Sequence, residues 1–153
     1  MADKTSSTTT IGAPKPAIMA VIADFSAYPQ WASGVRAAEI EESGADGRPA
    51  RVRFTLDAGV IKDRYLLGYT WSGDDEVTWE LVERGSMISD LTGAYRLDKA
   101  STGTRVTYEL SVGLAVPMPG IIKRRAEKTI IDTALKGLRG RVEQGAGESG
   151  GGM

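Results

Sequence analysis

Apolar and polar side chains alternate with a period of two through most of the chain, from Val35 to Val116. In a β-strand this period places the apolar side chains on one face and the polar side chains on the other. Short stretches rich in Gly, Asp and Ser interrupt the alternation at residues 43–47, 57–59, 72–75, 84–86 and 101–103. Consecutive strands with such short connections pair antiparallel. The pattern therefore predicts six antiparallel strands that share one apolar face.

The chain before these strands has a different pattern. Thr5 to Ala13 is rich in threonine, which favours a further strand. Ala17 to Phe25 has apolar residues at the mixed three- and four-residue spacing of a short helix. Asp24 or Ser26 can cap a second helical turn that runs toward Trp31. We therefore expect one strand and two short helices before the six strands.

A long helix is predicted from Pro119 to Glu143. A proline suits the first helical turn, and Ile131, Leu135, Leu138 and Val142 recur at helical spacing. Such a helix is about 35 Å long, which is about the length of a ten-residue strand. No other predicted helix is long enough to cover the apolar face of the sheet. The sequence thus predicts an α+β fold, in which a curved antiparallel sheet of about seven strands wraps around a long C-terminal helix.

Length and charge narrow the class of protein. A chain of 153 residues is typical of one domain, which we expect to span residues 1–144. Residues 145–153 are rich in glycine, which predicts a disordered tail. The net charge of -1 gives no reason to expect a nucleic acid as partner. No apolar run approaches the roughly 20 residues of a transmembrane segment. Met1 to Lys4 lacks the apolar core of a secretory signal, so a soluble, cytoplasmic protein is expected.

The absence of two residue types limits the chemistry. The sequence has no cysteine and no histidine, so it lacks disulfides, thiolate metal sites and the commonest general base. It also has no phosphate-binding glycine loop, no G-x-S-x-G motif and no metal-ligand spacing. We therefore expect no metal and no cofactor. Any proton transfer must use Asp, Glu, Tyr, Lys, Arg, Ser, Thr or a bound water.

Three local motifs resemble one protein superfamily. Asp24 to Trp31 reads D-F-S-A-Y-P-Q-W, which is similar to the D-x-x-x-Y-P-x-W segment of the cyclase-like and coenzyme-Q-binding branches of the START-like (SRPBCC) superfamily. Gly103 to Val106 is similar to its G-T-x-V strand opening, and Leu135 to Leu138 to its L-K-x-L near the C-terminus. The order of elements from Thr5 to Glu143 resembles the helix-grip fold of that superfamily. The superfamily includes polyketide cyclases and dehydratases, plant allergen-type carriers and lipid-transfer domains.

This resemblance implies an internal apolar cavity between the sheet and the long helix. The period of two directs one set of side chains toward it, namely Phe54, Tyr65, Leu67, Tyr69, Trp79, Tyr95 and Tyr108. Each of them alone is better explained by ordinary core packing. Four buried tyrosine hydroxyls, however, need hydrogen-bond partners, which a cavity with water or a polar ligand supplies. We expect Phe54, Trp79 and the four tyrosines to contact a ligand.

Four further residues are candidates for the mouth of the cavity. Trp31 is either a hydrophobic plug or a wall of the entrance, and Met118 is a flexible loop residue able to adapt to ligands. Arg124, Glu127 and Lys128 share a helix arc with the apolar residues that cover the sheet. Either this half of the helix extends beyond the sheet, or Arg124 or Glu127 meets a polar group of the ligand.

The opposite arc of the helix carries Ile122, Ala126 and Ile130, flanked by Lys123 and Arg125. This arc predicts an exposed apolar stripe. Such a stripe fits a homodimer or peripheral contact with a membrane surface, but a small apolar patch is also ordinary on a monomer.

Two functions fit the predicted cavity. The first is a carrier or sensor that binds a hydrophobic small molecule, such as a lipid, a polyketide or a quinone-like compound. The second, which the resemblance implies, is a polyketide cyclase or dehydratase that promotes aldol cyclisation and dehydration. In that case Tyr65, Tyr69, Tyr95 or Tyr108 acts as the proton donor. No acid–base pair is evident and histidine is absent, so we prefer binding.

Overall fold

The computed structural model describes residues 4–32 and 34–151, with only the backbone described from residue 145 onward. Its elements are β1 (Thr5–Ile11), α1 (Lys15–Ala23), the 3-10 turn η1 (Phe25–Ala27), α2 (Tyr28–Trp31), β2 (Val35–Ser43), β3 (Pro49–Ala58), β4 (Ile61–Ser72), β5 (Glu76–Glu83), β6 (Ile88–Ala100), β7 (Gly103–Leu114) and α3 (Gly120–Gly151). The predicted order of strand, short helices, six strands and long helix is confirmed.

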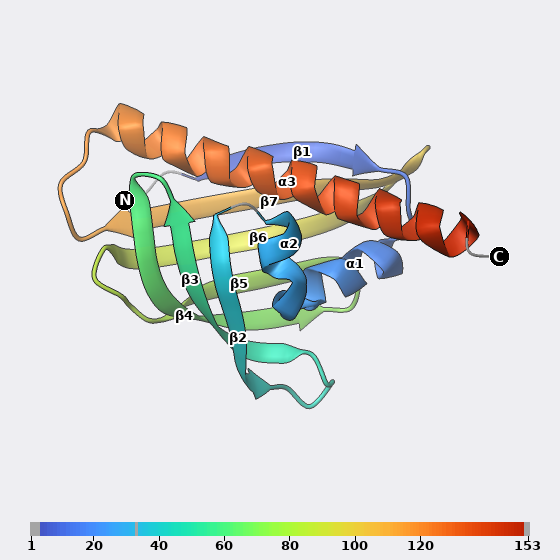
Figure 1. Ribbon diagram of the computed structural model, residues 1–153, viewed down its shortest axis with the longest axis horizontal. Helices are drawn as coiled ribbons and strands as arrows, with labels where there is room; N and C mark the ends of the chain where they lie inside the picture. Colours follow the sequence, from blue (N-terminus) through green and yellow to red (C-terminus); the bar gives the residue numbers. More distant parts are fainter. Residues whose placement is uncertain (1–3, 33, 152–153) are drawn as a thin grey trace.

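The strands form one seven-stranded antiparallel sheet in the order β1-β7-β6-β5-β4-β3-β2. β2 to β7 follow one another as a meander, and β1 pairs with β7. α3 runs along β1 and β7 across one face of the sheet, and α1 and α2 lie beside its C-terminal half (Figure 1). The predicted α+β class, with a long C-terminal helix on a curved antiparallel sheet, is therefore confirmed.

Period-two alternation explains the core. Most inward residues of β3 to β7 are buried, and Ile11, Val77 and Val106 have no exposed surface. From α3, Ile131 and Leu138 are equally buried and pack against this face. The outward positions carry threonines and ion pairs, as a sheet with one solvated face requires. No helix in the described residues is both long enough and apolar enough to cross a bilayer.

The exposed apolar stripe predicted on α3 is wrong at two of its three residues. Arg124 and Lys128 are exposed, whereas Ala126 is buried and Ile130 is partly buried. Lys128 and Leu135 are seven residues apart and therefore share nearly the same angular position. Leu135 is nonetheless buried, because α1 and α2 cover only the C-terminal half of the helix. Ala126 and Ile130 consequently do not belong to an exposed stripe.

The C-terminal end of α3 also differs from the expectation. The sequence predicts a helix that ends near Glu143, but α3 continues to Gly151. Glycine keeps both backbone hydrogen-bonding groups, so it can extend a helix at a cost of roughly 1 kcal/mol per residue relative to alanine. Residues 152–153 lie outside the described residues, and the division of the chain after residue 144 stays a prediction.

A glycine lets α3 approach α2 closely. A Cβ atom added to Gly137 would lie 1.9 Å from the carbonyl oxygen of Trp31. No side chain fits there, so only glycine allows the helix to touch the backbone at the end of α2. Gly140, further along the same helix, has no heavy atom within 4 Å of a built Cβ. The L-K-x-L segment therefore carries a packing requirement at its third position.

We expect Gly137→Ala to lower the free energy of unfolding by about 1–3 kcal/mol, because the added methyl forces α3 away from α2. Gly140→Ala is the matched control, and it should raise the same quantity by up to roughly 1 kcal/mol through helix propensity alone. Urea denaturation of both variants measures the difference. Stabilisation by both substitutions would contradict the close approach at Gly137.

Candidate functional site

A cavity of about 80 Å³ lies between the sheet, α2 and α3. Its wall is formed by Tyr28, Trp31, Ala32, Val35, Phe54, Leu56, Ile61, Tyr65, Leu67, Tyr69, Trp79, Ile88, Leu91, Tyr95, Tyr108, Leu110, Val112, Ile130 and Ala134. The structure thus brings together most of the predicted ligand-binding residues, namely Trp31, Phe54, Tyr65, Tyr69, Trp79, Tyr95 and Tyr108. Whether they bind a ligand stays a prediction.

The rings in this wall pack against one another. The rings of Phe54 and Tyr65 stack with their centroids 6.0 Å apart, and Trp79 meets Tyr108 edge to face at 5.6 Å. Tyr95 and Tyr108 are closer still, at 4.6 Å. A glycine makes room for the indole, since a Cβ on Gly93 would lie 2.3 Å from the Trp79 ring. The cavity therefore has a continuous aromatic wall on the sheet side.

Most polar atoms of this wall have no protein partner. Tyr28 is the exception, because its hydroxyl donates a hydrogen bond to the backbone carbonyl of Ile22. The hydroxyls of Tyr65, Tyr69, Tyr95 and Tyr108 make no hydrogen bond to any residue that the structure describes. The indole Nε1 of Trp31 is buried and likewise has no partner among the described residues. An unpaired buried donor costs about 1–3 kcal/mol, so the enclosed Trp31 N–H is costly unless a ligand or water pairs with it. The four tyrosine hydroxyls keep some accessible surface, which lets a ligand or water reach them.

Burial keeps these tyrosines in their neutral form. It raises the pKa of the Tyr65, Tyr95 and Tyr108 hydroxyls above the ordinary value for tyrosine. The pKa of Tyr69 is raised by burial and also by the neighbouring tyrosines. No Asp, Glu, Lys or Arg is among the described residues that line the cavity. At neutral pH the wall can therefore donate hydrogen bonds, but it offers no charged group.

The remaining predicted residues, Met118, Arg124 and Glu127, are not in the cavity wall. Arg124 is exposed, and Met118 is partly buried in the loop before α3. Glu127 is only 1% exposed, and its carboxylate accepts the backbone N–H of Val112 at 3.1 Å and the Thr5 hydroxyl at 3.3 Å. A role of these three residues in ligand binding stays a prediction.

The position of Glu127 has a structural reason. β1 begins at Thr5, which pairs with Leu110, so β7 continues beyond the end of its neighbour. The N–H of Val112, two residues further along β7, donates to Glu127 instead of to a described residue of β1. Lys123 Nζ lies 3.5 Å from the same carboxylate and balances its charge. The buried carboxylate therefore pairs with a backbone N–H group of β7.

Sequence reasoning missed the residue that organises one end of the cavity. The Asp63 carboxylate accepts backbone N–H groups of Ser86, Met87 and Ile88 at 2.7–2.9 Å, which fixes the turn between β5 and β6. Gly85 allows this approach, because a Cβ there would lie 2.1 Å from an Asp63 oxygen. The only signal in the sequence is a glycine in a predicted turn. Asp63 thereby holds the turn that precedes the cavity residue Ile88.

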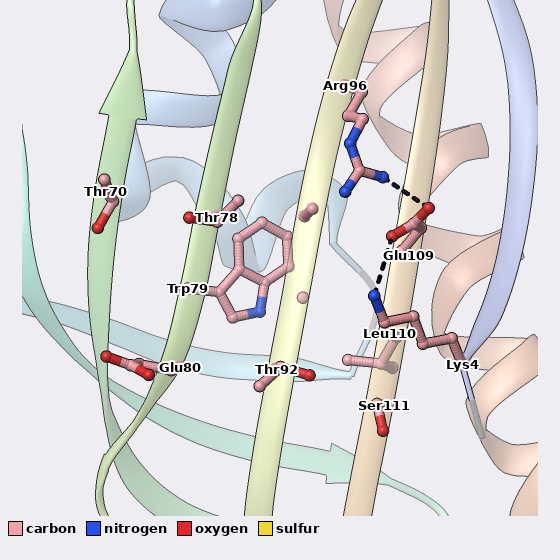
Figure 2. A pocket seen from close by; sticks show the side chains of 12 residues that line it. Lys4, Thr70, Thr78, Trp79, Glu80, Thr92, Arg96, Glu109, Leu110 and Ser111 are labelled. Carbon is pink, nitrogen blue, oxygen red and sulfur yellow. Dashed lines mark ion pairs between the residues drawn. The ribbon is translucent and has the colours of Figure 1, made fainter. Parts of the chain in front are cut away.

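A second hollow, of about 320 Å³, lies on the outer face of the sheet. Figure 2 shows it with α3 behind the strands, lined by hydroxyls such as those of Thr78 and Thr92. Arg96 crosses it and pairs with Glu76 at 2.7 Å and with Glu109 at 2.6 Å. Lys4, Arg96 and Glu109 thus already have protein partners here, whereas Glu80 forms no ion pair with a described residue. No cluster of metal-ligating residues occurs in the described part of the chain.

The fold and its enclosed aromatic cavity define a helix-grip domain of the START-like superfamily. The family described as "Polyketide cyclase / dehydrase and lipid transport" matches residues 2–143, and the chain belongs to this family. The predicted resemblance is confirmed. The fold of this family points to a ligand-binding or cyclase role. No curated protein sequence matches the chain.

Several solved structures share the fold. A START superfamily protein from Mycobacterium smegmatis is 22% identical, with a TM-score of 0.83 over 92% of this chain and 97% of that chain. The Zhui aromatase/cyclase from Streptomyces sp. R1128 is 14% identical, with a TM-score of 0.77 over 94% and 95%. A protein from Thermus thermophilus is 21% identical, with a TM-score of 0.77 over 94% and 99%. At such identities the likeness establishes the fold alone.

The hydrogen bonds of Asp63 generate a pH-dependent prediction. Burial raises the pKa of its carboxyl, but the backbone N–H groups of Ile88, Ser86, Arg64 and Met87 outweigh burial and lower it. Because the folded-state pKa is lowered, this carboxylate stabilises the fold above the ordinary aspartate value of about 4, and the contribution is lost as the pH falls. We expect Asp63→Asn to lower the free energy of unfolding by about 2 kcal/mol at pH 7.

Urea denaturation at pH 7 and near pH 3 measures this effect, and the two proteins should differ less at the lower pH. Asp90→Asn is the control, because Asp90 is exposed and forms no ion pair or hydrogen bond with a described residue. It should change stability by less than about 0.5 kcal/mol. A difference for Asp63→Asn that does not shrink with pH would exclude the charge as its cause.

Two tyrosine substitutions distinguish a paired from an unpaired hydroxyl. Tyr28→Phe should lower the free energy of unfolding by about 1 kcal/mol, since it removes the bond to the Ile22 carbonyl. Tyr95→Phe should leave this quantity unchanged or raise it, because its hydroxyl has no partner among the described residues. Thermal and urea unfolding of the ligand-free protein test both. Equal losses would mean that the Tyr95 hydroxyl is paired.

Proposed function

We propose that this protein binds a neutral, largely apolar small molecule that carries hydrogen-bond acceptors, such as a quinone-like or polyketide compound. The observation that carries the proposal is the set of unpaired donors in an aromatic cavity, the hydroxyls of Tyr65, Tyr69, Tyr95 and Tyr108 and the Trp31 indole N–H. Carbonyl oxygens on a flat ring system satisfy such donors while the rings contact the aromatic wall.

The lining residues carry no charge, which supports a neutral ligand. A carboxylate ligand, such as a fatty acid, would lose its hydration on entry and find no cation among the lining residues. A pure hydrocarbon would leave the tyrosine hydroxyls unpaired. A molecule with carbonyl or ether oxygens avoids both penalties. Among lipids, polyketides and quinones, the wall therefore favours acceptor-rich uncharged compounds.

The size of the cavity makes binding a two-step process. A volume of 80 Å³ is small beside the roughly 300–1,000 Å³ of a typical ligand pocket. A bicyclic ligand must therefore displace side chains, and Trp31 and Ile130 belong to the helices that cover the sheet. A ligand that must first displace side chains should bind with an association rate constant below the usual range of roughly 10⁵–10⁷ M⁻¹s⁻¹.

A cyclase function is the second candidate. It is supported by the family description and by the shared fold of the Zhui aromatase/cyclase. The Tyr95 and Tyr108 rings pack edge to face with their centroids 4.6 Å apart, so both hydroxyls are available to donate to one folded polyketone chain. The raised pKa values of both tyrosines make them weak proton donors at neutral pH, so orientation rather than acid catalysis would supply the rate.

The binding proposal predicts that 1,4-naphthoquinone, a neutral compound with two carbonyl acceptors, quenches the fluorescence of Trp31 and Trp79. The chain has no cysteine that this quinone could alkylate. Tyr95→Phe and Tyr108→Phe should each weaken its affinity about fivefold, which corresponds to one hydrogen bond of about 1 kcal/mol. Naphthalene, which lacks acceptors, should bind more weakly to the wild type and equally well to the variants.

Thr104→Val is the control for these variants. It removes a buried hydroxyl that donates to the Ala13 carbonyl and does not line the cavity, so the affinity should stay within twofold. Equal binding of naphthalene and naphthoquinone would contradict a role for the donors. Turnover of a linear poly-β-ketone mimic, lost in Tyr95→Phe and Tyr108→Phe, would instead favour the cyclase.

A further inference from the structure

Exposed apolar side chains gather at one end of the molecule. The exposed large apolar residues in the described chain are Ile40, Val60, Val82, Val116, Ile121 and Ile122. Val60 lies in the turn between β3 and β4, Val116 in the loop before α3, and Ile121 and Ile122 in the first turn of α3. In this antiparallel meander the β3–β4 turn, the β5–β6 turn and the β7–α3 loop lie at the same end, on the left of Figure 1.

Backbone hydrogen bonds hold these segments together. Asp63, near the start of β4, accepts the N–H groups of Ser86, Met87 and Ile88 from the β5–β6 turn. The Met87 carbonyl in turn accepts the N–H of Ala115 from the β7–α3 loop at 2.8 Å. The three connections at this end are thus joined into one preformed surface.

Cations without partners surround the apolar residues. Lys62, Arg84, Arg124 and Arg125 are exposed, and none forms an ion pair with a described residue. Lys62 lies in β4, two residues after Val60, and Arg84 lies in the β5–β6 turn. Arg124 and Arg125 follow Ile122 in the first turns of α3. On the outer face of the sheet, by contrast, a cation such as Arg53 is paired with two glutamates.

The acidic groups at this end do not neutralise the four cations. Asp57 pairs with Arg36, and Glu83 pairs with Arg53. Glu127 pairs with Lys123, whereas Asp63 keeps its negative charge and forms no ion pair with a described residue. Asp90 is the exposed carboxylate of this region that lacks an ion-pair partner in the described chain. Four unpaired cations thus face the unpaired carboxylates of Asp63 and Asp90. This end therefore has a net positive charge, although the whole chain carries -1.

We propose that this end is a docking face for a membrane surface rich in anionic lipid headgroups. The docking face consists of the apolar residues Val60, Val116, Ile121 and Ile122 and the cations that surround them. The four apolar side chains enter the headgroup layer, while Lys62, Arg84, Arg124 and Arg125 attract the anionic headgroups.

The composition of the docking face favours lipid over a second copy of the chain or another protein. Its apolar side chains come from three separate segments, two single valines and the pair Ile121 and Ile122, and cations belong to the same or neighbouring segments. This mixed surface suits a lipid headgroup layer better than a shape-complementary protein partner. A lipid surface adapts to separate protrusions and supplies negative charge around each of them. Two copies of this positive end would also repel each other.

The docking face adjoins the cavity. Ile61 and Ile88, the first residues of β4 and β6, line the cavity and directly follow the β3–β4 and β5–β6 turns. Docking would therefore place the end of the cavity that Ile61 and Ile88 line next to the membrane surface. The inference does not depend on the proposed ligand, because binding to vesicles is measured on the protein without any added ligand.

Flotation with liposomes tests the proposal. The full-length protein should bind vesicles of phosphatidylcholine containing a third phosphatidylserine, and should bind pure phosphatidylcholine at least tenfold more weakly. Raising the salt from 0.1 to 0.5 M should weaken binding, because salt screens the attraction. The double variant Arg124→Glu/Arg125→Glu should lose at least tenfold in affinity, since each cation removed is worth about fivefold. Ile121→Ser/Ile122→Ser should also bind more weakly.

Lys99→Glu/Arg105→Glu is the matched control. Both residues are exposed, lack ion-pair partners in the described chain and flank the β6–β7 turn at the opposite end. This variant has the same net charge as the arginine variant and should bind vesicles like the wild type. Equal losses in the two charge variants, or no binding by the wild type, would overturn the proposal. So would self-association that Ile121→Ser/Ile122→Ser abolishes in the absence of vesicle binding. Circular dichroism and melting temperatures establish that each variant is folded.

Discussion

One helix must cover the apolar face of a seven-stranded sheet, and the rest of the structure depends on this constraint. α3 lies along β1 and β7, and its contribution to the cavity wall is limited to Ile130 and Ala134. These two side chains are too short to reach the strands on the far side of the sheet. Aromatic rings on the sheet and the residues of α2 fill most of the remaining space, because each ring buries about 150–250 Å². The cavity is the volume that this arrangement leaves open.

The polar atoms of the cavity differ from other buried polar atoms of this protein. Tyr28, Thr104 and Glu127 are buried as well, but each has a partner in the backbone. The hydroxyls of Tyr95 and Tyr108, by contrast, have no partner in the described chain, although phenylalanine would fill nearly the same space. Polar groups that pair with nothing else in the fold are characteristic of functional sites. Stability alone therefore does not account for the tyrosines.

The meander and the aromatic wall could be predicted from sequence because both follow from local alternation. Strand pairs such as β3 and β4 are neighbours in the chain, and their inward residues are set by a period of two. The rotation of α3 could not be predicted, since α1 and α2 decide which of Lys128 and Leu135 is buried. The role of Asp63 was also hidden, because most of its partners are backbone N–H groups more than twenty residues away. The place of Glu127 depends on where β1 begins, which no pattern in the sequence reveals.

Burial of the tyrosines bears on binding and on catalysis in opposite ways. It leaves the hydroxyls neutral and available as donors to a neutral acceptor, and it raises their pKa so that proton release at neutral pH is unfavourable. The same donors would nevertheless stabilise negative charge that develops on a bound carbonyl oxygen, as in an enolate. A ligand without an acidic C–H group would be held unchanged, whereas a poly-β-ketone would become easier to enolise. Whether this wall acts as a carrier or a cyclase therefore depends on the chemistry of the ligand more than on any further group in the protein.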